Sequence, residues 1–347
     1  MKKLRVGVIG LGMGAAHVHG YRGHPDAEVV AVADKDSNRL AARGKELQIA
    51  SQYTDPIQML RKEKLDIVSV ATPNKFHKSL TLAALKAGCH VLCEKPMAMN
   101  AKESRDMIEG ARKAKRRLMI NFSYRFNDQS YAMKRTVEDG ILGDIYYART
   151  IWNRRRGLPG LGSWFGQKAL SGGGPLIDLG VHRLDLALWL MNYPKPVWVM
   201  GGTYDPIARR LAKEAKKAYD VEDFASAMIR FDNGATLALE ASWAANIKDR
   251  EEMETRLLGT KAGLVQKNIN ETYQWEAEVY LERNGCQFDM KLHPPVPQAT
   301  GAMVHFVDAL LNNRPHIATG EEGMTVMKIL DAIYLSSAKG APVQIKT

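Results

Sequence analysis

The stretch Leu4-Arg5-Val6-Gly7-Val8-Ile9-Gly10-Leu11-Gly12-Met13-Gly14-Ala15 decides the fold of this 347-residue chain. Its first half is a β-branched apolar run, which is typical of a buried strand, and its second half is a glycine-rich turn that opens a helix. In such a turn Gly10 permits a tight exit from the strand, Gly12 permits close approach of the backbone, and Ala15 is small where helix meets strand. A basic start before an apolar run also resembles a signal peptide, but the glycines favour the strand.

This turn predicts a dinucleotide-binding site. The helix that begins near Met13 presents free N–H groups and a positive dipole end to phosphates. Asp34 lies 24 residues after Gly10, at the end of the next predicted strand. A carboxylate there binds ribose hydroxyls and repels a 2′-phosphate, which favours NAD. Lys35 and Arg39 lie nearby and attract phosphate, so NADP stays open.

Strands and helices alternate over the first 126 residues. The predicted strands are 4–9, 28–33, 65–70, 90–93 and 118–122, and the predicted helices include 13–23, 56–62, 74–87 and one that Asn100 caps. This alternation predicts a doubly wound parallel sheet of the Rossmann type over residues 1–126.

The pattern changes from residue 127 onward. Longer alternating runs at 145–152, 197–203, 225–231, 235–243, 252–258, 263–265 and 273–281 predict strands, and Asn233-Gly234 predicts a hairpin turn. Two helices are expected at 302–312 and 321–338. Residues 127–347 are therefore predicted to form an α+β substrate-binding and oligomerisation domain with a large, mainly antiparallel open sheet.

Composition narrows the function classes. The net charge is +11, but basic residues alternate with acidic ones and no basic motif is interleaved with aromatics, so no nucleic-acid partner is expected. No run of about 18 apolar residues exists, so no membrane span is expected. Cys89 and Cys93 are too far apart on one strand to form a disulfide, and with Cys286 they suggest reduced thiols in the cytoplasm.

Glu94-Lys95-Pro96 closes the strand at 90–93 and carries the predicted chemistry. An open α/β sheet binds its ligands at the carboxyl ends of its strands, so Lys95 is expected to bring its amine to the reactive ring of the dinucleotide. Another strand ends near Thr72, with Asn74 and His77 following, and these residues are expected near the nicotinamide half. The alternative is an ordinary turn in which Asn74 caps the next helix.

A second candidate group lies in the second domain. Asp178 and His182 are four residues apart on a predicted helix, where a carboxylate can orient an imidazole as a general base. A buried hydrogen-bonded pair is the alternative, and no metal site is predicted because no third ligand stands nearby. His17 and His19 are expected to be surface or helix-packing histidines.

Other residues are expected to face the substrate. Tyr124 and Arg125 follow the last strand of the first domain, where Arg125 can instead form a salt bridge. The glycine-rich segment 154–174 is predicted to be a binding loop or lid that uses Arg154 and Trp164, with a mobile surface connection as the alternative.

These motifs together resemble the glucose–fructose oxidoreductase / inositol dehydrogenase / MocA family over most of the chain. The resemblance rests on the glycine turn, Ala71-Thr72-Pro73-Asn74, Glu94-Lys95-Pro96, the spacing of Gly174, Asp178 and His182, and Thr319-Gly320-Glu321-Glu322-Gly323. It implies Lys95 and His182 as the catalytic pair with Asp178 beside them, sugar, polyol or cyclitol substrates, and homodimers or homotetramers formed through the second sheet.

Three functions follow from these residues. The first is a dehydrogenase that transfers hydride between a secondary alcohol and the nicotinamide. His182 then takes the hydroxyl proton while the Lys95 ammonium stabilises the alkoxide, or Lys95 takes the proton itself. The second is a glycosidase that oxidises its sugar transiently with NAD, and the third is a sensor that binds a dinucleotide without turnover.

Overall fold

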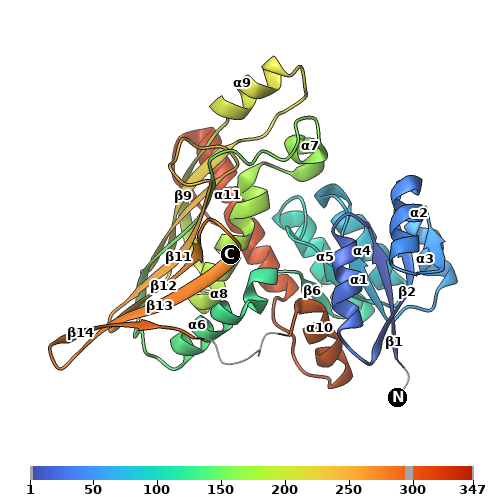
Figure 1. Cartoon of the computed structure of the whole chain (residues 1–347), viewed down its shortest axis with the longest axis horizontal. Coiled ribbons are helices and arrows are strands. Elements are labelled where there is room, and N and C mark those ends of the chain that lie inside the picture. Colours follow the sequence, from blue (N-terminus) through green and yellow to red (C-terminus); the bar gives the residue numbers. More distant parts are fainter. Residues whose placement is uncertain (1–2, 294–299, 346–347) are drawn as a thin grey trace. The chain divides into compact units, whose positions relative to one another are not determined.

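The computed structural model describes residues 3–293 and 300–345, and the chain divides into two compact units (Figure 1). The first unit comprises Met1–Phe122 and Thr300–Met327, and the second comprises Ser123–Ala299 and Lys328–Thr347. This division differs from the predicted contiguous domains 1–126 and 127–347, because a C-terminal segment returns to the first unit.

The first unit is built on six parallel strands, β1 (Leu4–Ile9), β2 (Ala27–Ala33), β3 (Ser51–Tyr53), β4 (Ile67–Val70), β5 (His90–Cys93) and β6 (Leu118–Ile120). Their order in the sheet is β3-β2-β1-β4-β5-β6. The connections carry α1 (Gly14–Arg22), α2 (Ser37–Glu46), α3 (Pro56–Lys62), α4 (His77–Lys86) and α5 (Ala101–Ala114). This strand order is that of a doubly wound dinucleotide-binding domain, whose ligand site lies at the carboxyl ends of the neighbouring strands β1 and β4, where the strand order reverses.

The returning segment completes the first unit through packing and a backbone bond. It contains α10 (Ala302–Leu311), which packs on α1 so closely that a Cβ on Gly20 would lie 2.9 Å from Met303 Sδ. Farther along, the Ile120 amide donates to the Ala318 carbonyl at 2.9 Å. The apolar side of α1 and the edge of β6 need this cover, and nothing local in the sequence indicates which segment supplies it.

The second unit is built on nine strands, β7 (Ile145–Arg154), β8 (Pro196–Tyr204), β9 (Phe224–Phe231), β10 (Thr236–Ser242), β11 (Glu251–Gly259), β12 (Ala262–Ile269), β13 (Gln274–Arg283), β14 (Cys286–Lys291) and β15 (Val343–Gln344). The sheet order is β14-β13-β12-β11-β7-β10-β9-β8-β15. Neighbours are antiparallel except β7 and β10. The hairpin between β9 and β10 turns at Asn233-Gly234 as predicted, and Gly234 has φ +85°.

Helices cover one face of this sheet and leave the other open, as Figure 1 shows for α6 (Asp128–Glu138), α8 (Val181–Leu190) and α11 (Gly320–Lys339). On β8, a Cβ on Gly201 would meet Ile333 of α11 at 2.9 Å, so Gly201 faces the helices. Its neighbours in the strand therefore face the open side. The predicted fold class, a Rossmann-type sheet followed by a mainly antiparallel α+β unit, is confirmed.

Several elements were not predicted, among them β3, β14, β15, α7 (Lys168–Ser171) and α9 (Pro206–Glu214). β3 has three residues, every residue of β14 is exposed, and α9 buries Ala208 and Ala212 within a charged sequence. The short strand β3 and the solvated strand β14 carry little hydrophobic periodicity, so only their pairing in the sheet defines them. Across the described residues, none of the helices is both long enough and apolar enough to cross a membrane.

Candidate active site

The glycine turn has the geometry that a dinucleotide requires. Gly10 has φ +90°, and a Cβ there would lie 2.5 Å from the Ala71 carbonyl oxygen, so β1 and the end of β4 are in close contact. Gly12 and Met13 are exposed, and α1 begins at Gly14. A Cβ on Gly14 would meet Val8 Cγ1 at 2.8 Å. The close approach of helix and strand therefore falls at Gly14, and not at Ala15 as predicted.

Asp34 links the end of β2 to this turn. One carboxylate oxygen accepts from the Leu11 amide at 2.8 Å and the other from the Asp36 amide at 2.9 Å. The Arg39 guanidinium lies 3.6 Å from Asp34 and 3.0 Å from Asp36, whereas Lys35 is exposed. Arg39, one of the two cations predicted to attract a 2′-phosphate, is thus paired with two carboxylates. This pairing favours NAD.

The end of β4 presents Thr72 and Asn74. The Thr72 hydroxyl is buried and has no hydrogen-bond partner within residues 3–293 and 300–345. Asn74 is buried and opens a 3₁₀ turn (Asn74–Phe76), and α4 begins at His77 without a side-chain cap, so Asn74 is not its N-cap. His77 is fully buried, with Nε2 2.8 Å from the Thr72 carbonyl oxygen and Nδ1 2.8 Å from that of Pro96. Both nitrogens face protein carbonyls, so direct cofactor contact, the predicted role of His77, does not fit its surroundings.

Glu94 is held rigidly beside the half-buried Lys95. Glu94 Oε1 accepts from His17 Nε2 at 2.7 Å and from Asn121 Nδ2 at 2.6 Å, and Oε2 accepts from the Lys95 amide at 3.1 Å. Burial alone would raise the pKa of Glu94, but the bond from His17 outweighs it together with Asn121 and the charge of Lys95, and the pKa falls to about 2. Glu94 therefore stays ionised in neutral solution. His19 is exposed as expected, but His17 belongs to this buried network.

This edge of the first sheet fits a dinucleotide. It combines a backbone that tolerates no side chain at Gly10, an exposed helix start at Met13, the carboxylate of Asp34 and the unsatisfied Thr72 hydroxyl. These are the parts that bind a pyrophosphate and a ribose in this fold.

In the second unit, Asp178 and His182 lie on one continuous helical segment. It starts as a π-helical turn (Leu176–Gly180) and continues as α8, whereas a regular α-helix was predicted. Asp178 Oδ2 accepts from the Trp243 indole at 3.1 Å, and the His182 ring meets the Tyr124 ring edge-on with centroids 4.9 Å apart. Single π-turns occur often at functional sites because they re-aim neighbouring side chains.

Glu222, which sequence reasoning missed, fixes the start of this segment. Its Oε1 accepts from the amides of Gly174 and Leu176 at 2.9 and 3.1 Å and from the Tyr334 hydroxyl at 2.8 Å. A Cβ on Gly174 would lie 2.1 Å from the Glu222 carbonyl oxygen, so this position requires glycine.

Aromatic rings surround His182 and the next residue, Arg183. The Arg183 guanidinium is fully buried and lies 4.9, 5.5 and 4.4 Å from the ring centroids of Tyr124, Trp152 and Trp275. Burial lowers the pKa of Arg183 to about 10. The sequence shows no periodicity that would have indicated this group, because its members come from four separate elements.

Of the predicted binding residues, Arg154 lies against the Trp152 ring, and Trp164 reaches the aromatic cluster only through Phe165. Arg154 Nε donates to Glu251 Oε1 at 2.8 Å and Nη2 to the Tyr273 hydroxyl at 2.8 Å. Trp164 stacks on Phe165 with centroids 3.9 Å apart, and Phe165 packs against the buried aromatic cluster. The segment 154–174 is thus anchored to the core of its unit, which favours a binding loop over a mobile connection.

Arg125 lies in a different environment from the one predicted. It is fully buried, donates to both carboxylate oxygens of Asp185 at 2.9 and 2.6 Å, and contacts the Tyr193 hydroxyl. Both carboxylate oxygens of Asp185 are thereby bonded. We assign Arg125 to this ion pair, which was the predicted alternative, because its guanidinium is fully buried and paired with Asp185 through two donors.

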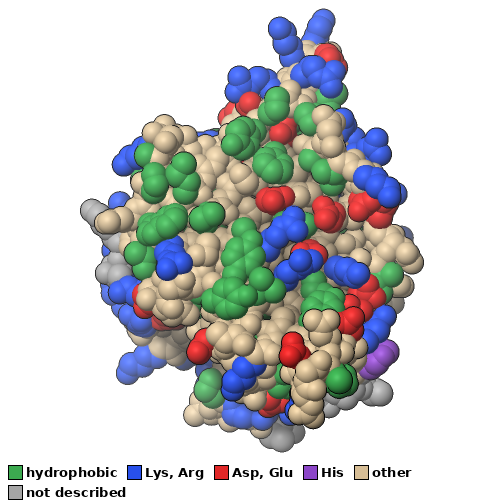
Figure 2. All heavy atoms as spheres, turned by 90° about the vertical axis from the view of Figure 1, so that its left-hand side faces the viewer, with side chains coloured by type: hydrophobic (Ala, Val, Ile, Leu, Met, Phe, Trp, Pro, Cys, Tyr) green, Lys and Arg blue, Asp and Glu red, His purple; other side chains and the backbone are tan. Residues whose placement is uncertain are grey.

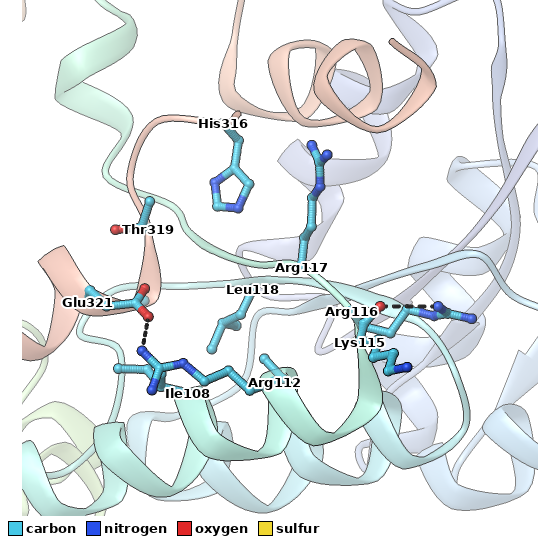
Figure 3. Close-up of a pocket in the computed structure, with 11 residues that line it drawn as sticks. Ile108, Arg112, Lys115, Arg116, Arg117, Leu118, His316, Thr319 and Glu321 are labelled. Atoms are coloured by element: carbon cyan, nitrogen blue, oxygen red, sulfur yellow. Dashed lines mark hydrogen bonds and ion pairs between the residues drawn. The ribbon is translucent and has the colours of Figure 1, made fainter. Parts of the chain in front are cut away.

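A basic pocket of about 240 Å³ lies at the opposite, amino-terminal edge of the first sheet (Figure 3). Figure 3 shows Arg116 and Arg117 pointing away from its centre and Arg112 paired with Glu321 at 2.9 Å. The Arg117 guanidinium donates instead to the Ala309 carbonyl at 2.8 Å. Two guanidinium groups that line the pocket are therefore engaged by protein partners. No group of three or more His, Cys, Asp or Glu residues is arranged to hold a metal ion in the part of the chain that the structure describes.

Comparisons with known proteins agree with this geometry. Residues 4–122 match the oxidoreductase family with an NAD-binding Rossmann fold, and residues 131–265 match the GFO/IDH/MocA C-terminal domain. The chain is 34% identical to D-glucoside 3-dehydrogenase of Escherichia coli (strain K12), over 99% of this chain and 97% of the relative. It is 30% identical to myo-inositol 2-dehydrogenase of Thermotoga maritima, over 92% of each chain. A protein of gentamicin A biosynthesis, solved in complex with NAD, is 26% identical with a TM-score of 0.82, covering 100% of this chain and 97% of that one.

The first unit has a sheet edge that fits a dinucleotide, and the second has aromatic rings beside Asp178 and His182. Together these features are those of an NAD-dependent oxidoreductase. The chain belongs to the GFO/IDH/MocA oxidoreductase family. The predicted family, enzyme class and NAD cofactor are confirmed, and dehydrogenases among the relatives favour that activity over the glycosidase and sensor alternatives.

Proposed function

We propose that the chain oxidises a secondary hydroxyl of a pyranose ring with NAD, and that D-glucosides are the first substrates to test. One observation carries the proposal. Lys95 follows β5 at the carboxyl edge of the sheet, the same edge at which Gly10 meets Ala71. An amine at that edge lies where this fold binds the reactive half of a dinucleotide. The choice of D-glucosides rests on the Escherichia coli relative, which matches nearly the whole chain.

The proposed chemistry uses Lys95 of the first unit and His182 of the second. NAD supplies the hydride acceptor when it is bound. His182 accepts the hydroxyl proton, while the Lys95 ammonium stabilises the negative charge that develops on the oxygen. The hydroxyl thus loses its proton and the carbon its hydride, and a ketone forms.

The rings of the second unit support a sugar ligand. Tyr124 and Trp152 lie beside His182, with ring centroids 4.9 and 5.8 Å from the imidazole, and the Arg154 guanidinium lies 5.3 Å from the Trp152 ring centroid. Pockets of this kind combine large apolar side chains with a few polar groups that fix orientation. We propose that these rings bind the apolar face of the pyranose.

The substrate is tested by measuring NADH formation with methyl D-glucosides, D-glucose, myo-inositol and aryl D-glucosides, each with NAD and with NADP. We expect NADH from D-glucosides, a faster reaction with NAD than with NADP, and a keto-glycoside product by NMR. Release of the aryl group without net NADH would instead identify the transient-oxidation glycosidase. Dinucleotide binding without reduction of any substrate would identify the sensor.

We also propose that the chain forms a homodimer or homotetramer through the open face of the second sheet (Figure 2). Met200 and Met228 are opposite each other in the register of β8 and β9 and are 45% and 49% exposed. Toward the centre of this face Arg149 lies 3.6 Å from Glu254 and 4.0 Å from Glu240. Figure 2 shows apolar side chains interleaved with charges of both signs, a pattern that suits a self-complementary interface.

Replacing both Met200 and Met228 by glutamate should produce a monomer, because a symmetric interface would bring the new charges of the two copies together. Light scattering coupled to size exclusion measures the mass, and the matched control is Ile141→Glu, an exposed residue in the turn after α6 (38% exposed). An unchanged mass for the double variant would exclude this face as the interface.

A further inference from the structure

The turn Glu94-Lys95-Pro96 has a buried support on each side of Lys95. On one side the Glu94 carboxylate is bonded to His17 Nε2 at 2.7 Å. On the other side the Pro96 carbonyl oxygen lies 2.8 Å from His77 Nδ1. Both histidines are at most 1% exposed.

The first support reaches across three elements. His17 lies on α1, and its Nδ1 is 3.0 Å from the Ser69 hydroxyl of β4, which is itself 3.0 Å from the Tyr21 hydroxyl. If Tyr21 donates to Ser69 and Ser69 donates to Nδ1, His17 Nε2 carries the proton and donates to Glu94. Each group in this series of hydrogen bonds, from Tyr21 to Glu94, then has a partner, so the Glu94 carboxylate is fixed in one position.

The second support joins two strand ends. His77 is the first residue of α4, and its Nε2 is 2.8 Å from the Thr72 carbonyl oxygen while Nδ1 is 2.8 Å from the Pro96 carbonyl oxygen. Burial lowers the pKa of His77, and a neutral imidazole has one N–H, so the ring donates to one of these carbonyls and contacts the other. The ring therefore lies fixed between the end of β4, at the predicted nicotinamide half of the site, and the turn that carries Lys95. A buried polar group with defined partners costs free energy to displace, so the ring restrains both segments.

We propose that His17 and His77 are positioning residues that hold Lys95 in place for the reaction, His17 through the Glu94 carboxylate and His77 through the Pro96 carbonyl. This inference rests on the proposed catalytic role of Lys95. Neither histidine touches the substrate. Their effect on rate comes from the placement of the ammonium, and a displacement of about 1 Å can lower turnover by about 10²-fold.

Each ring has a polar contact at each of its two nitrogens, and amide side chains separate these contacts. At position 17, His17→Gln places its amide nitrogen near the lost Nε2 and keeps the bond to Glu94, whereas His17→Asn reaches only Ser69. At position 77 the logic reverses. His77→Asn keeps the bond to Pro96, and His77→Gln keeps only the bond to Thr72. Both members of a pair remove the same imidazole, so each is the matched control of the other.

We expect the two variants that keep the bond to the turn, His17→Gln and His77→Asn, to have a kcat close to that of the wild type. The other two, His17→Asn and His77→Gln, should lose up to about 10²-fold in kcat with an unchanged NAD dissociation constant. Equal kcat within each pair, or losses that follow the unfolding temperature alone, would overturn the proposal. The two pairs of variants are independent. If one pair does not fold, the other still tests the role of its own histidine.

Hydrogen exchange of the Lys95 amide separates this inference from the function on which it rests. That amide donates to Glu94 Oε2 at 3.1 Å, so it should exchange faster in His17→Asn than in His17→Gln. If exchange differs in this way but Lys95→Ala retains turnover, the support stands and the catalytic role of Lys95 is wrong. If exchange is equal in the two variants, His17 does not position the turn.

Discussion

Replacing Lys95 by alanine should lower turnover by about 10²–10⁴-fold while NAD still binds. The structure gives the reason for both halves of this result. Lys95 follows a strand end whose neighbouring carboxylate, Glu94, is fixed by three donors, so the loss of the ammonium leaves the turn in place. The groups expected to bind the dinucleotide, at Gly10 and Asp34, lie on other strands of the sheet. Steady-state kinetics gives the turnover, and NADH fluorescence titration gives the dissociation constant.

The matched control is Lys86→Ala, which removes an exposed lysine at the end of α4 in the same unit and should leave both quantities unchanged. Lys95→Arg distinguishes the two roles that the sequence left open. Arginine retains a positive charge but does not release its proton. Partial activity of this variant would favour charge stabilisation, and activity as low as that of Lys95→Ala would favour proton transfer by Lys95. A Lys95→Ala enzyme with wild-type turnover would remove Lys95 from the mechanism.

Replacing Arg125 by methionine should lower the free energy of unfolding by about 3–5 kcal/mol. The substitution leaves the Asp185 carboxylate, 1% exposed, with the Tyr193 hydroxyl at 2.7 Å but without a cation. A buried charge without its counter-ion is among the most destabilising changes in a protein core. Chemical denaturation followed by tryptophan fluorescence measures the effect.

Two further variants test this interpretation of Arg125. Tyr193→Phe removes one neutral donor to Asp185 and should cost only about 0.5–1.5 kcal/mol. The double variant with Arg125→Met and Asp185→Leu should regain much of the stability lost in the single variant, because no unpaired charge remains. A loss below about 1 kcal/mol for Arg125→Met alone would contradict a buried ion pair.

Local patterns were enough to predict most of the first unit. The limits of β1, α3 and β5 are as expected, and Asn100 caps α5 by accepting from the Glu103 amide at 2.9 Å. Such elements are specified by residues close together in the sequence, through β-branched runs and caps. In the second unit, alternation located β7 to β13 but missed β14, whose residues are all exposed.

Parts of the candidate site that depend on residues close together in the sequence were predicted, and parts that depend on distant partners were not. Gly10, Asp34 and Lys95 stand at strand ends, and in a parallel sheet every strand end of that kind lies on one edge, so their position follows from the sequence. The surroundings of His77 could not be predicted, because its two nitrogens face carbonyl oxygens from separate strand ends. Glu222 and Arg183 were missed because their partners lie on distant segments.

The sequence by itself determined where most strands of the first unit lie along the chain, the glycine turn and the strand end that carries Lys95, because each depends on backbone geometry within a few residues. Only the tertiary structure decided which polar side chains support the site. The bond of His17 to Glu94 spans 77 positions and that of Arg125 to Asp185 spans 60. Partners so far apart in the sequence leave no periodic signal. The geometry of the folded core decides which buried polar groups lie close enough to form hydrogen bonds.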